Sequence, residues 1–388
     1  MKKIRVGILG LLRGESFIGT VNCMEDAEVT AVCDKNPELL SKIAEKYGDG
    51  IRYCADFDEL LDTGIDCVFL CNYFHEHAPF AIRAFARGIA VFSECTSAST
   101  LKQCAELCDA YEACHAKYMI GENYPFTAAM LEIEKKCREG KFGRILYAEG
   151  EYNHTGTWQT LKQLTPAPYH WRAYLARTYY STHSLGPLMY CTKQDPVSVS
   201  AFAVHSDVLE KEIGFRQNYD AFAMMTCRTT DGALFRFNGN AHMGSESGYR
   251  IVGEYGSGET GRSLGSRVNI HYHDWTRPED ELSDSIYEPE FEEKYQAAKG
   301  RGHSGGDYVT VRNFLDYIRG GEPPFFDVYR GCTMSAAAIL GWRSCLENGK
   351  VFDIPDFRDK KQRDAVRGDD LTPFPDETGN GATLPCHC

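Results

Sequence analysis

Tyr180 and His183 are the pair of residues whose types and spacing best suit proton-transfer chemistry. A separation of three places two side chains on the same side of one helical turn. Histidine exchanges protons near neutral pH because its unperturbed pKa is about 6.5, and a neighbouring phenol can relay a proton or orient a bound molecule. The alternative interpretation is that the pair forms a polar cluster at a domain interface. The elements predicted around the pair are needed to distinguish this from a catalytic site.

The start of the chain predicts a different chemistry, the binding of a dinucleotide. The apolar run Ile4–Leu9 breaks at Gly10, and a helix-like segment follows. In parallel α/β folds such a turn brings a pyrophosphate to a helix N-terminus. The spacing is imperfect, because a G-x-G-x-x-G series would need glycine where Leu12 and Glu15 stand. We expect Leu12 to hinder close approach, and the turn to be reshaped around Arg13–Gly14 with the Arg13 guanidinium contacting phosphate.

Asp34 ends the second predicted strand, which begins at Val29. An acidic residue at about this distance after the glycine turn accepts hydrogen bonds from the adenosine ribose, and its charge repels a 2′-phosphate. The sequence therefore predicts NAD as cofactor rather than NADP. The alternative is an aspartate that only starts a turn.

Strand-like and helix-like segments alternate through the first third of the chain. Such alternation is typical of βαβ units and a parallel sheet covered on both faces. The sequence predicts an α/β, doubly wound Rossmann domain over residues 1–124. The further strands are expected at 67–71, 90–92 and 118–120, and the helices at 37–47, 79–87 and 101–116.

The pattern changes after Pro125, where a long amphipathic helix, Phe126–Glu139, is followed by segments of alternating polarity. This alternation predicts an α+β domain over residues 125–357, with an open, largely antiparallel sheet. Residues 358–388, rich in Asp, Pro and Gly, are expected to form a polar C-terminal tail. The expected strands are 145–152, 197–204, 221–228, 233–240 and 249–254, with helices at 307–319 and 328–347.

Composition excludes several partners. A net charge of −13 over 388 residues, with no basic stripe, argues against nucleic acid. No apolar stretch approaches the ~20 residues of a membrane span, and Met1-Lys2-Lys3 enters a strand directly, without the pattern of a signal peptide. Cysteines such as Cys67 and Cys104 lie in apolar runs, as expected of reduced thiols in the cytoplasm.

Three clusters contain residue types that bind metals. They are His75-Glu76-His77, His271-Tyr272-His273 and Cys386-His387-Cys388. No pair of CxxC motifs accompanies them, and ordinary surface or cofactor-edge roles suit these histidines better. We therefore expect no metal.

The layout resembles the glucose–fructose oxidoreductase, inositol dehydrogenase and MocA family over nearly the whole chain to about Phe357. The block His77–Gly88, followed by Val91–Thr96, carries the resemblance in the first domain. Family members show Glu-Lys-Pro at the end of this second segment. Here Glu94 is present, but Cys95 replaces the lysine that helps move the hydroxyl proton in typical dehydrogenases of the family.

The block Tyr179–Pro187, preceded by Trp171-Arg172, is similar to the Tyr-x-x-His-x-Leu-Gly-Pro signature of NAD-dependent α-N-acetylgalactosaminidases, a glycosidase branch of that family. Glu122–Tyr124, Glu149–Tyr152 and Gly302–Tyr308 also resemble this branch. Its members use bound NAD+ to oxidise the sugar's carbon-3 hydroxyl transiently. The new ketone acidifies the carbon-2 proton and so allows elimination of the aglycone, after which water adds and the hydride returns.

The resemblance implies roles for particular residues. His183 would deprotonate the carbon-3 hydroxyl, Tyr180 would relay a proton or orient the sugar, and Tyr124 would take the carbon-2 proton. Arg172, Tyr152 and Glu94 would bind substrate. The expected cofactor-binding residues are Gly10, Leu12, Arg13, Gly14, Asp34, Asn72, His77 and Glu94.

Two other functions stay open. One is a net NAD-dependent dehydrogenase of a sugar or polyol, with His183 as base. The other is a non-catalytic NAD-binding sensor or scaffold, suggested by the missing lysine and the degraded glycine series. By analogy with the family, which commonly associates through the outer face of the second sheet, we expect a homodimer or homotetramer.

Overall fold

The computed structural model describes residues 2–153, 157–206, 208–214, 220–240, 247–376 and 378–384. They form two compact units, each assembled from several stretches of chain. The first contains the residues up to Asn123 together with 300–332 and 357–369, and the second contains 124–299, 333–356 and the residues from 370 onward. In these described ranges, no helix combines the length and the apolarity needed to cross a membrane.

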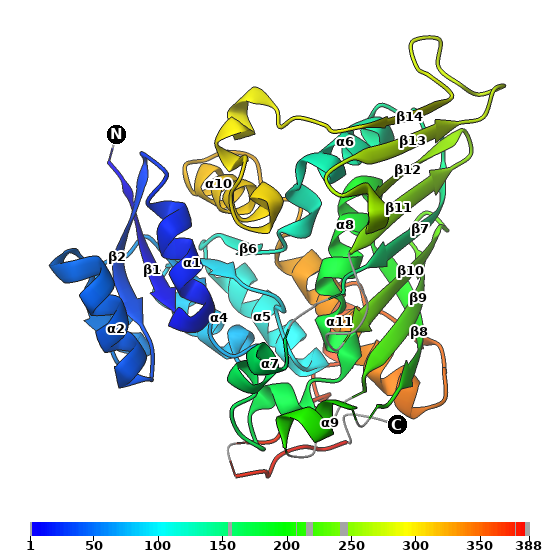
Figure 1. Cartoon of the computed structure of the whole chain (residues 1–388). Helices are drawn as coiled ribbons and strands as arrows, with labels where there is room; N and C mark the ends of the chain where they lie inside the picture. Colours follow the sequence, from blue (N-terminus) through cyan, green and yellow to red (C-terminus); the bar gives the residue numbers. More distant parts are fainter. Residues whose placement is uncertain are drawn as a thin grey trace. The chain divides into compact units, whose positions relative to one another are not determined.

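The first unit is built on a six-stranded sheet whose strands are all parallel, as predicted for a doubly wound fold. The order is β3-β2-β1-β4-β5-β6, so the direction of winding changes between β1 and β4. Figure 1 labels β1, β2 and β6 of this sheet. The strands are β1 (Ile4–Leu9), β2 (Ala27–Cys33), β3 (Arg52–Cys54), β4 (Cys67–Leu70), β5 (Ala90–Ser93) and β6 (Tyr118–Ile120). The helices from the N-terminal stretch are α1 (Leu11–Val21), α2 (Pro37–Tyr47), α3 (Phe57–Leu61), α4 (His77–Phe85) and α5 (Leu101–Ala113).

The core of this unit explains why a later stretch of chain belongs to it. Phe17 of α1 packs edge-on against Phe69 of β4 with ring centroids 5.6 Å apart, and Phe69 also contacts Phe314 at 5.9 Å. Phe314 lies on α10 (Gly306–Ile318), where Arg312 forms an ion pair with Asp26 at 2.7 Å. Residues 300–332, predicted within the second domain, therefore complete the first unit instead.

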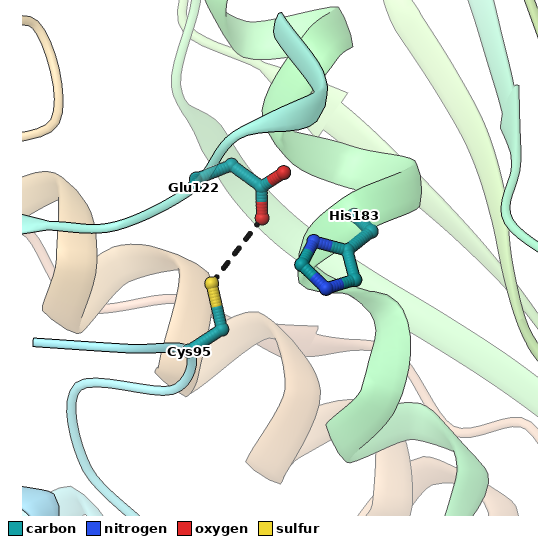
Figure 2. Close-up of side chains that lie close together, drawn as sticks. All are labelled: Cys95, Glu122 and His183. Atoms are coloured by element: carbon teal, nitrogen blue, oxygen red, sulfur yellow. Dashed lines mark hydrogen bonds between the residues drawn. The ribbon is translucent and has the colours of Figure 1, made fainter. Parts of the chain in front are cut away.

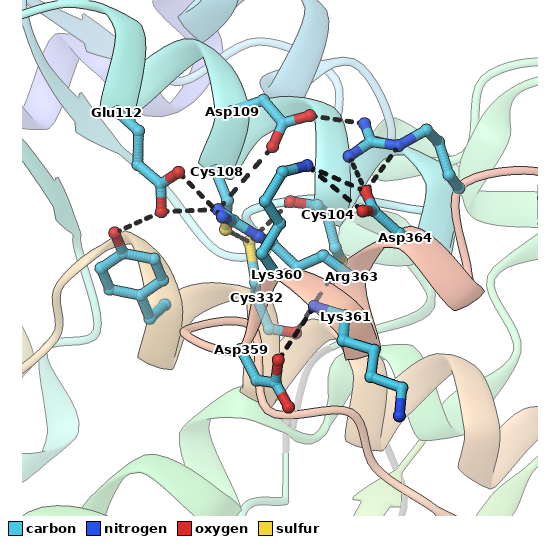
Figure 3. A network of polar contacts seen from close by, with 12 residues as sticks. Cys104, Cys108, Asp109, Glu112, Cys332, Asp359, Lys360, Lys361, Arg363 and Asp364 are labelled. Carbon is cyan, nitrogen blue, oxygen red and sulfur yellow. Dashed lines mark hydrogen bonds and ion pairs between the residues drawn. The ribbon is translucent and has the colours of Figure 1, made fainter.

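The predicted polar tail also differs in the structure. Residues 360–365 form α12 (Lys360–Ala365), and Arg363 on this helix is only 2% exposed. Its two terminal nitrogens donate to both carboxylate oxygens of Glu112 on α5, at 2.7 and 2.8 Å (Figure 3). Charged composition suggested a solvated arm, but paired charges let this segment pack against the Rossmann helices. The Cys386-His387-Cys388 cluster lies outside the described residues.

Arg363→Ala is expected to destabilise the protein by about 1–3 kcal/mol, because it removes the buried arginine of a bidentate, part-buried ion pair and leaves Glu112 without its strongest partner. Thermal unfolding followed by fluorescence measures the change. Arg367→Ala is the matched control, because Arg367 pairs with Asp109 and Asp364 but is far more exposed, and its loss should cost under about 1 kcal/mol. Equal shifts for both variants would contradict the anchoring role of Arg363.

The second unit contains a nine-stranded sheet of order β14-β13-β12-β11-β7-β10-β9-β8-β15. β7 and β10 are parallel, and every other neighbouring pair is antiparallel, as predicted for an open, largely antiparallel sheet. The strands are β7 (Ile145–Glu151), β8 (Pro196–Val204), β9 (Phe222–Thr229), β10 (Leu234–Asn240), β11 (Gly248–Gly253), β12 (Gly256–Gly261), β13 (Val268–Tyr272), β14 (Asp284–Tyr287) and β15 (Phe352–Asp353). The helices are α6 (Ala128–Arg138), α7 (Trp158–Leu164), α8 (Thr182–Thr192), α9 (Val208–Ile213) and most of α11 (Val328–Leu346).

Candidate active site

The glycine turn of the first unit has the geometry that nucleotide binding needs. Gly10 follows β1 with φ 87°, and a Cβ there would lie 2.5 Å from the carbonyl oxygen of Cys71. α1 begins at once with Leu11, and a Cβ on Gly14 would lie 2.5 Å from the side chain of Ile8. Gly14 thus provides the close helix–strand packing that the usual series assigns to its third glycine, one position earlier than expected. The Leu12 side chain is 75% exposed.

Asp34 lies next to this turn, at the carboxyl end of β2. The Leu11 N–H donates to Asp34 Oδ2 at 2.7 Å, and the Asn36 N–H donates to Oδ1 at 2.9 Å. The aspartate therefore starts the turn into α2 and also orders the first turn of α1. This position is compatible both with starting a turn and with binding the adenosine ribose, because each carboxylate oxygen of Asp34 can accept a second hydrogen bond.

Arg13 has partners other than the predicted phosphate. Its guanidinium donates to Glu94 Oε1 at 2.7 Å through Nε and to Asp307 Oδ1 at 2.9 Å through Nη2. Burial favours a lower pKa for Arg13, but the charges of Glu94 and Asp307 outweigh burial and raise it. The same contact occupies Glu94, which was expected beside the nicotinamide ribose or the substrate.

Two buried amide oxygens at this edge accept no hydrogen bond from any described residue. They are Asn72 Oδ1, just after β4, and Asn123 Oδ1, just after β6. Buried polar atoms without partners are rare in proteins and indicate a missing ligand or water. Both lie at the carboxyl ends of parallel strands, where dinucleotides bind in such sheets. These acceptors and the turn at Gly10 fit a bound dinucleotide.

His77 contacts the backbone at the same edge of the sheet through its ring. Its buried ring lies 2.7 Å from the carbonyl oxygen of Thr96 through Nδ1 and 3.3 Å from that of Asn72 through Nε2. Burial lowers the pKa of His77, so the neutral ring is favoured. His77 therefore fixes the loops that follow β4 and β5.

Cys95 occupies the position at which the family resemblance places a lysine. Its thiol donates to Glu122 Oε2 at 3.3 Å, and the Glu122 side chain is completely buried (Figure 2). A thiol cannot supply the charge or the reach of an ammonium group. In the sequence Glu122 stands out only as part of a block that resembles the glycosidase branch, and only the fold reveals that its carboxylate is buried.

The second unit gathers aromatic residues around His183. The ring centroid of His183 lies 4.7 Å from that of Tyr152, 4.9 Å from Tyr124 and 5.8 Å from Tyr180. Arg172 joins the group, with its guanidinium 5.9 Å from the Tyr180 ring centroid. We call these five residues the His183 cluster. The structure thus brings together every residue of the second unit that was predicted to act on substrate.

Backbone packing positions the cluster. A Cβ on Gly150 of β7 would overlap the carbonyl oxygen of Ser184 on α8, so strand and helix meet backbone to backbone. The Tyr249 hydroxyl donates to the His183 carbonyl oxygen at 2.8 Å, and the Ser184 hydroxyl donates to that of Asn238 at 2.6 Å. These contacts hold the first turn of α8 against three strands and fix where the imidazole points.

Tyr152 is the phenol of the cluster whose protonation the structure favours most clearly. Burial is the main cause that raises the pKa of Tyr152, with further contributions from Tyr180 and Tyr124. Tyr152 is therefore a neutral donor at physiological pH. Tyr180 itself precedes α8 with non-helical φ and ψ of −95° and 35°. The rings of Tyr180 and His183 are therefore close although these residues do not share one helical turn.

Glu149 begins one of the blocks that resemble the glycosidase branch, but its side chain belongs to the other face of the sheet. It alternates with Gly150 on β7 and therefore points away from α8. Arg262 and Arg236 pair with it at 2.8 and 3.2 Å. Burial opposes ionisation, yet these contacts lower the pKa of Glu149, so it serves as an ionised structural group.

Together these features define a two-unit protein of the Rossmann oxidoreductase type, with a nucleotide-binding edge in one unit and a histidine–tyrosine cluster in the other. Residues 4–122 match the oxidoreductase family with an NAD-binding Rossmann fold, GFO/IDH/MocA, and residues 224–363 match the C-terminal domain of glycosyl hydrolase 109. The chain therefore combines an NAD-binding Rossmann domain that matches the first family with a C-terminal domain that matches the second.

Several relatives are similar to this chain over both of its domains. A glycosyl hydrolase family 109 protein of Shewanella amazonensis is 26% identical over 92% of this chain and 86% of its own length. An α-N-acetylgalactosaminidase of Tannerella forsythia is 25% identical, over 91% and 86%. Among solved structures, an oxidoreductase domain protein of Kribbella flavida (TM-score 0.75, 17% identity) and a levoglucosan dehydrogenase with NADH and L-sorbose (0.73, 19%) share the fold over 92% of this chain and all of theirs.

Proposed function

We propose that the protein is a glycosidase that uses NAD catalytically. The carbon-3 hydroxyl of a sugar would be oxidised to a ketone, the aglycone eliminated and water added, and the ketone would then be reduced again. The observation that carries the proposal is the His183 cluster, a base-type side chain enclosed by three phenols in a chain with a glycosyl hydrolase 109 domain. A glycosidase of this kind needs several proton transfers in one site, and the cluster offers several exchangeable protons.

The residues that would hold NAD lie in the first unit. The turn at Gly10 would receive the pyrophosphate, Asp34 would bind the adenosine ribose and exclude a 2′-phosphate, and Asn72 Oδ1 would accept a hydrogen bond. When bound, NAD supplies reversible acceptance of a hydride from the sugar.

The second unit would handle protons and orientation. His183 would take the proton of the carbon-3 hydroxyl, which makes hydride loss from that carbon favourable. Tyr124 would take the carbon-2 proton once the neighbouring ketone has acidified it, and Tyr152, a neutral donor, would bind a sugar oxygen. Arg172 would fix sugar hydroxyls through its planar set of donors.

A nitrophenyl glycoside assay tests the proposal. Because a relative carries the name α-N-acetylgalactosaminidase, the first substrate is 4-nitrophenyl α-N-acetylgalactosaminide. We expect nitrophenol release that needs only catalytic NAD+ and leaves no lasting NADH absorbance. NADH that accumulates in proportion to sugar would instead show a net dehydrogenase, the class of the levoglucosan enzyme that shares this fold. NAD binding without turnover of any glycoside or sugar would show a sensor, the function that Cys95 suggests.

Two further properties are proposed by analogy. We expect the enzyme to work in the cytoplasm, and to associate as a homodimer or homotetramer. Light scattering of the purified protein measures the second property.

A further inference from the structure

Asp307 is the centre of a buried polar network in the first unit. It stands in the first turn of α10 and is 4% exposed. Arg13 Nη2 and Asn123 Nδ2 donate to its Oδ1 at 2.9 and 2.7 Å, and His303 Nδ1 lies 2.8 Å from Oδ2. Burial favours a higher pKa for Asp307, but the contacts with His303 and Arg13 outweigh it and lower the pKa. The carboxylate is therefore charged at every physiological pH.

The partners of Asp307 share one location. Arg13 follows the turn after β1, and Asn123 follows β6. Arg13 also contacts Glu94, which follows β5, and its guanidinium lies 4.4 Å from the Phe17 ring centroid. These strands are parallel, so their carboxyl ends meet at the edge where a dinucleotide binds. Asp307 is thus tied to the cofactor edge from outside the N-terminal stretch of chain.

The segment that leads to Asp307 is held in an unfavourable backbone conformation. His303, Ser304 and Gly305 have φ values of 50°, 53° and 90° in succession. L side chains rarely adopt this region, so the first two residues are strained. Gly306 then lies so close to the Asn123 carbonyl oxygen that a Cβ would overlap it. Contacts at Asp307 must therefore hold residues 302–307 in place against the strain.

We infer that residues 302–307 form a strap that retains NAD, and that the ion pair between Arg13 and Asp307 keeps it closed. Arg13 and Asp307 are then positioning residues that set the rate of cofactor release rather than the chemistry. This inference rests on the proposed function, in which the hydride returns within each turnover and the cofactor need not leave. A net dehydrogenase would have to open the strap in every cycle.

NADH release tests the strap directly. The protein is loaded with NADH and mixed with excess NAD+ in a stopped-flow instrument, and loss of bound-NADH fluorescence gives the dissociation rate. Asp307→Asn and Arg13→Gln should each release NADH at least about tenfold faster, because each removes a charge-assisted contact of the closed strap. The double variant should be little faster than either single one, because both remove the same contact.

Arg312→Ala is the matched control. It breaks the ion pair of α10 with Asp26, which precedes β2 and so lies at the opposite end of the sheet from the cofactor edge. This variant should lose thermal stability but release NADH at the wild-type rate.

The outcomes separate the strap from the function on which it rests. Unchanged release in both single variants, or equally fast release in Arg312→Ala, overturns the strap while leaving NAD binding and glycoside cleavage as they were. Wild-type protein that does not bind NADH overturns the strap and the proposed function together. Arg13→Gln, at a partly exposed side chain, keeps the test decisive where Asp307→Asn fails to fold.

Discussion

His183→Ala is expected to lower the turnover number for a nitrophenyl glycoside by about 10²–10⁴-fold, the usual contribution of a positioned general base. The imidazole is the one group of its cluster whose residue type exchanges protons near neutral pH, since its neighbours Tyr124, Tyr152 and Tyr180 are phenols. NAD affinity should stay close to the wild-type value, because the residues proposed to hold the cofactor all belong to the Rossmann unit. Single-turnover kinetics and calorimetry measure the two quantities.

His271→Ala provides the comparison for this variant. His271 lies on β13 of the same unit, is partly exposed and pairs with Asp284 at 2.7 Å, so its loss removes an imidazole without touching the cluster. It should leave turnover within about twofold, as expected for a surface ion pair. Turnover within a few-fold of wild type in His183→Ala would mean that another group is the base, and the Cys95–Glu122 pair would then be examined first.

The Rossmann sheet was predictable because its strands are short apolar runs between helices of ordinary length. Val68 and Phe69 of β4 are completely buried, and a strand buried on both faces shows in sequence as continuous hydrophobicity. The position of the glycine turn after the first strand was predictable, but the roles of its individual glycines were not. Gly14 performs the packing role of the glycine sought at position 15, and only the contact with Ile8 reveals it.

Other features depend on contacts that are distant in sequence. The strand β12 (Gly256–Gly261) contains three glycines and has low intrinsic strand propensity, so only its pairing with β11 and β13 makes it a strand. Asp307 lay in a glycine-rich block that resembled a motif, and nothing in the sequence indicated that its carboxylate meets Arg13. Local patterns located the residues of the candidate site, whereas their partners required the fold.

Gly10→Ala is expected to weaken NAD binding strongly and to destabilise the Rossmann unit. The residue needs φ 87°, a conformation that costs a non-glycine residue about 1–3 kcal/mol. The new Cβ would also lie 2.5 Å from the Cys71 carbonyl oxygen and 2.6 Å from the Asn72 backbone nitrogen, so the turn must shift away from β4. That shift moves the amides that we propose to receive the pyrophosphate, and calorimetry should show at least a ~100-fold loss of NAD affinity.

Gly19→Ala on the same helix isolates the effect of the turn from the effect of adding a methyl group. Apart from the nearby backbone of its own helix, no described atom lies within 4 Å of a Cβ at Gly19. Alanine in a helix interior is favoured over glycine by about 0.5–1 kcal/mol, so this variant should be slightly more stable and bind NAD normally. If Gly10→Ala also bound NAD with unchanged affinity, the dinucleotide would not use this turn, and a carboxyl-edge site would have to rest on Asn72 and Asn123 alone.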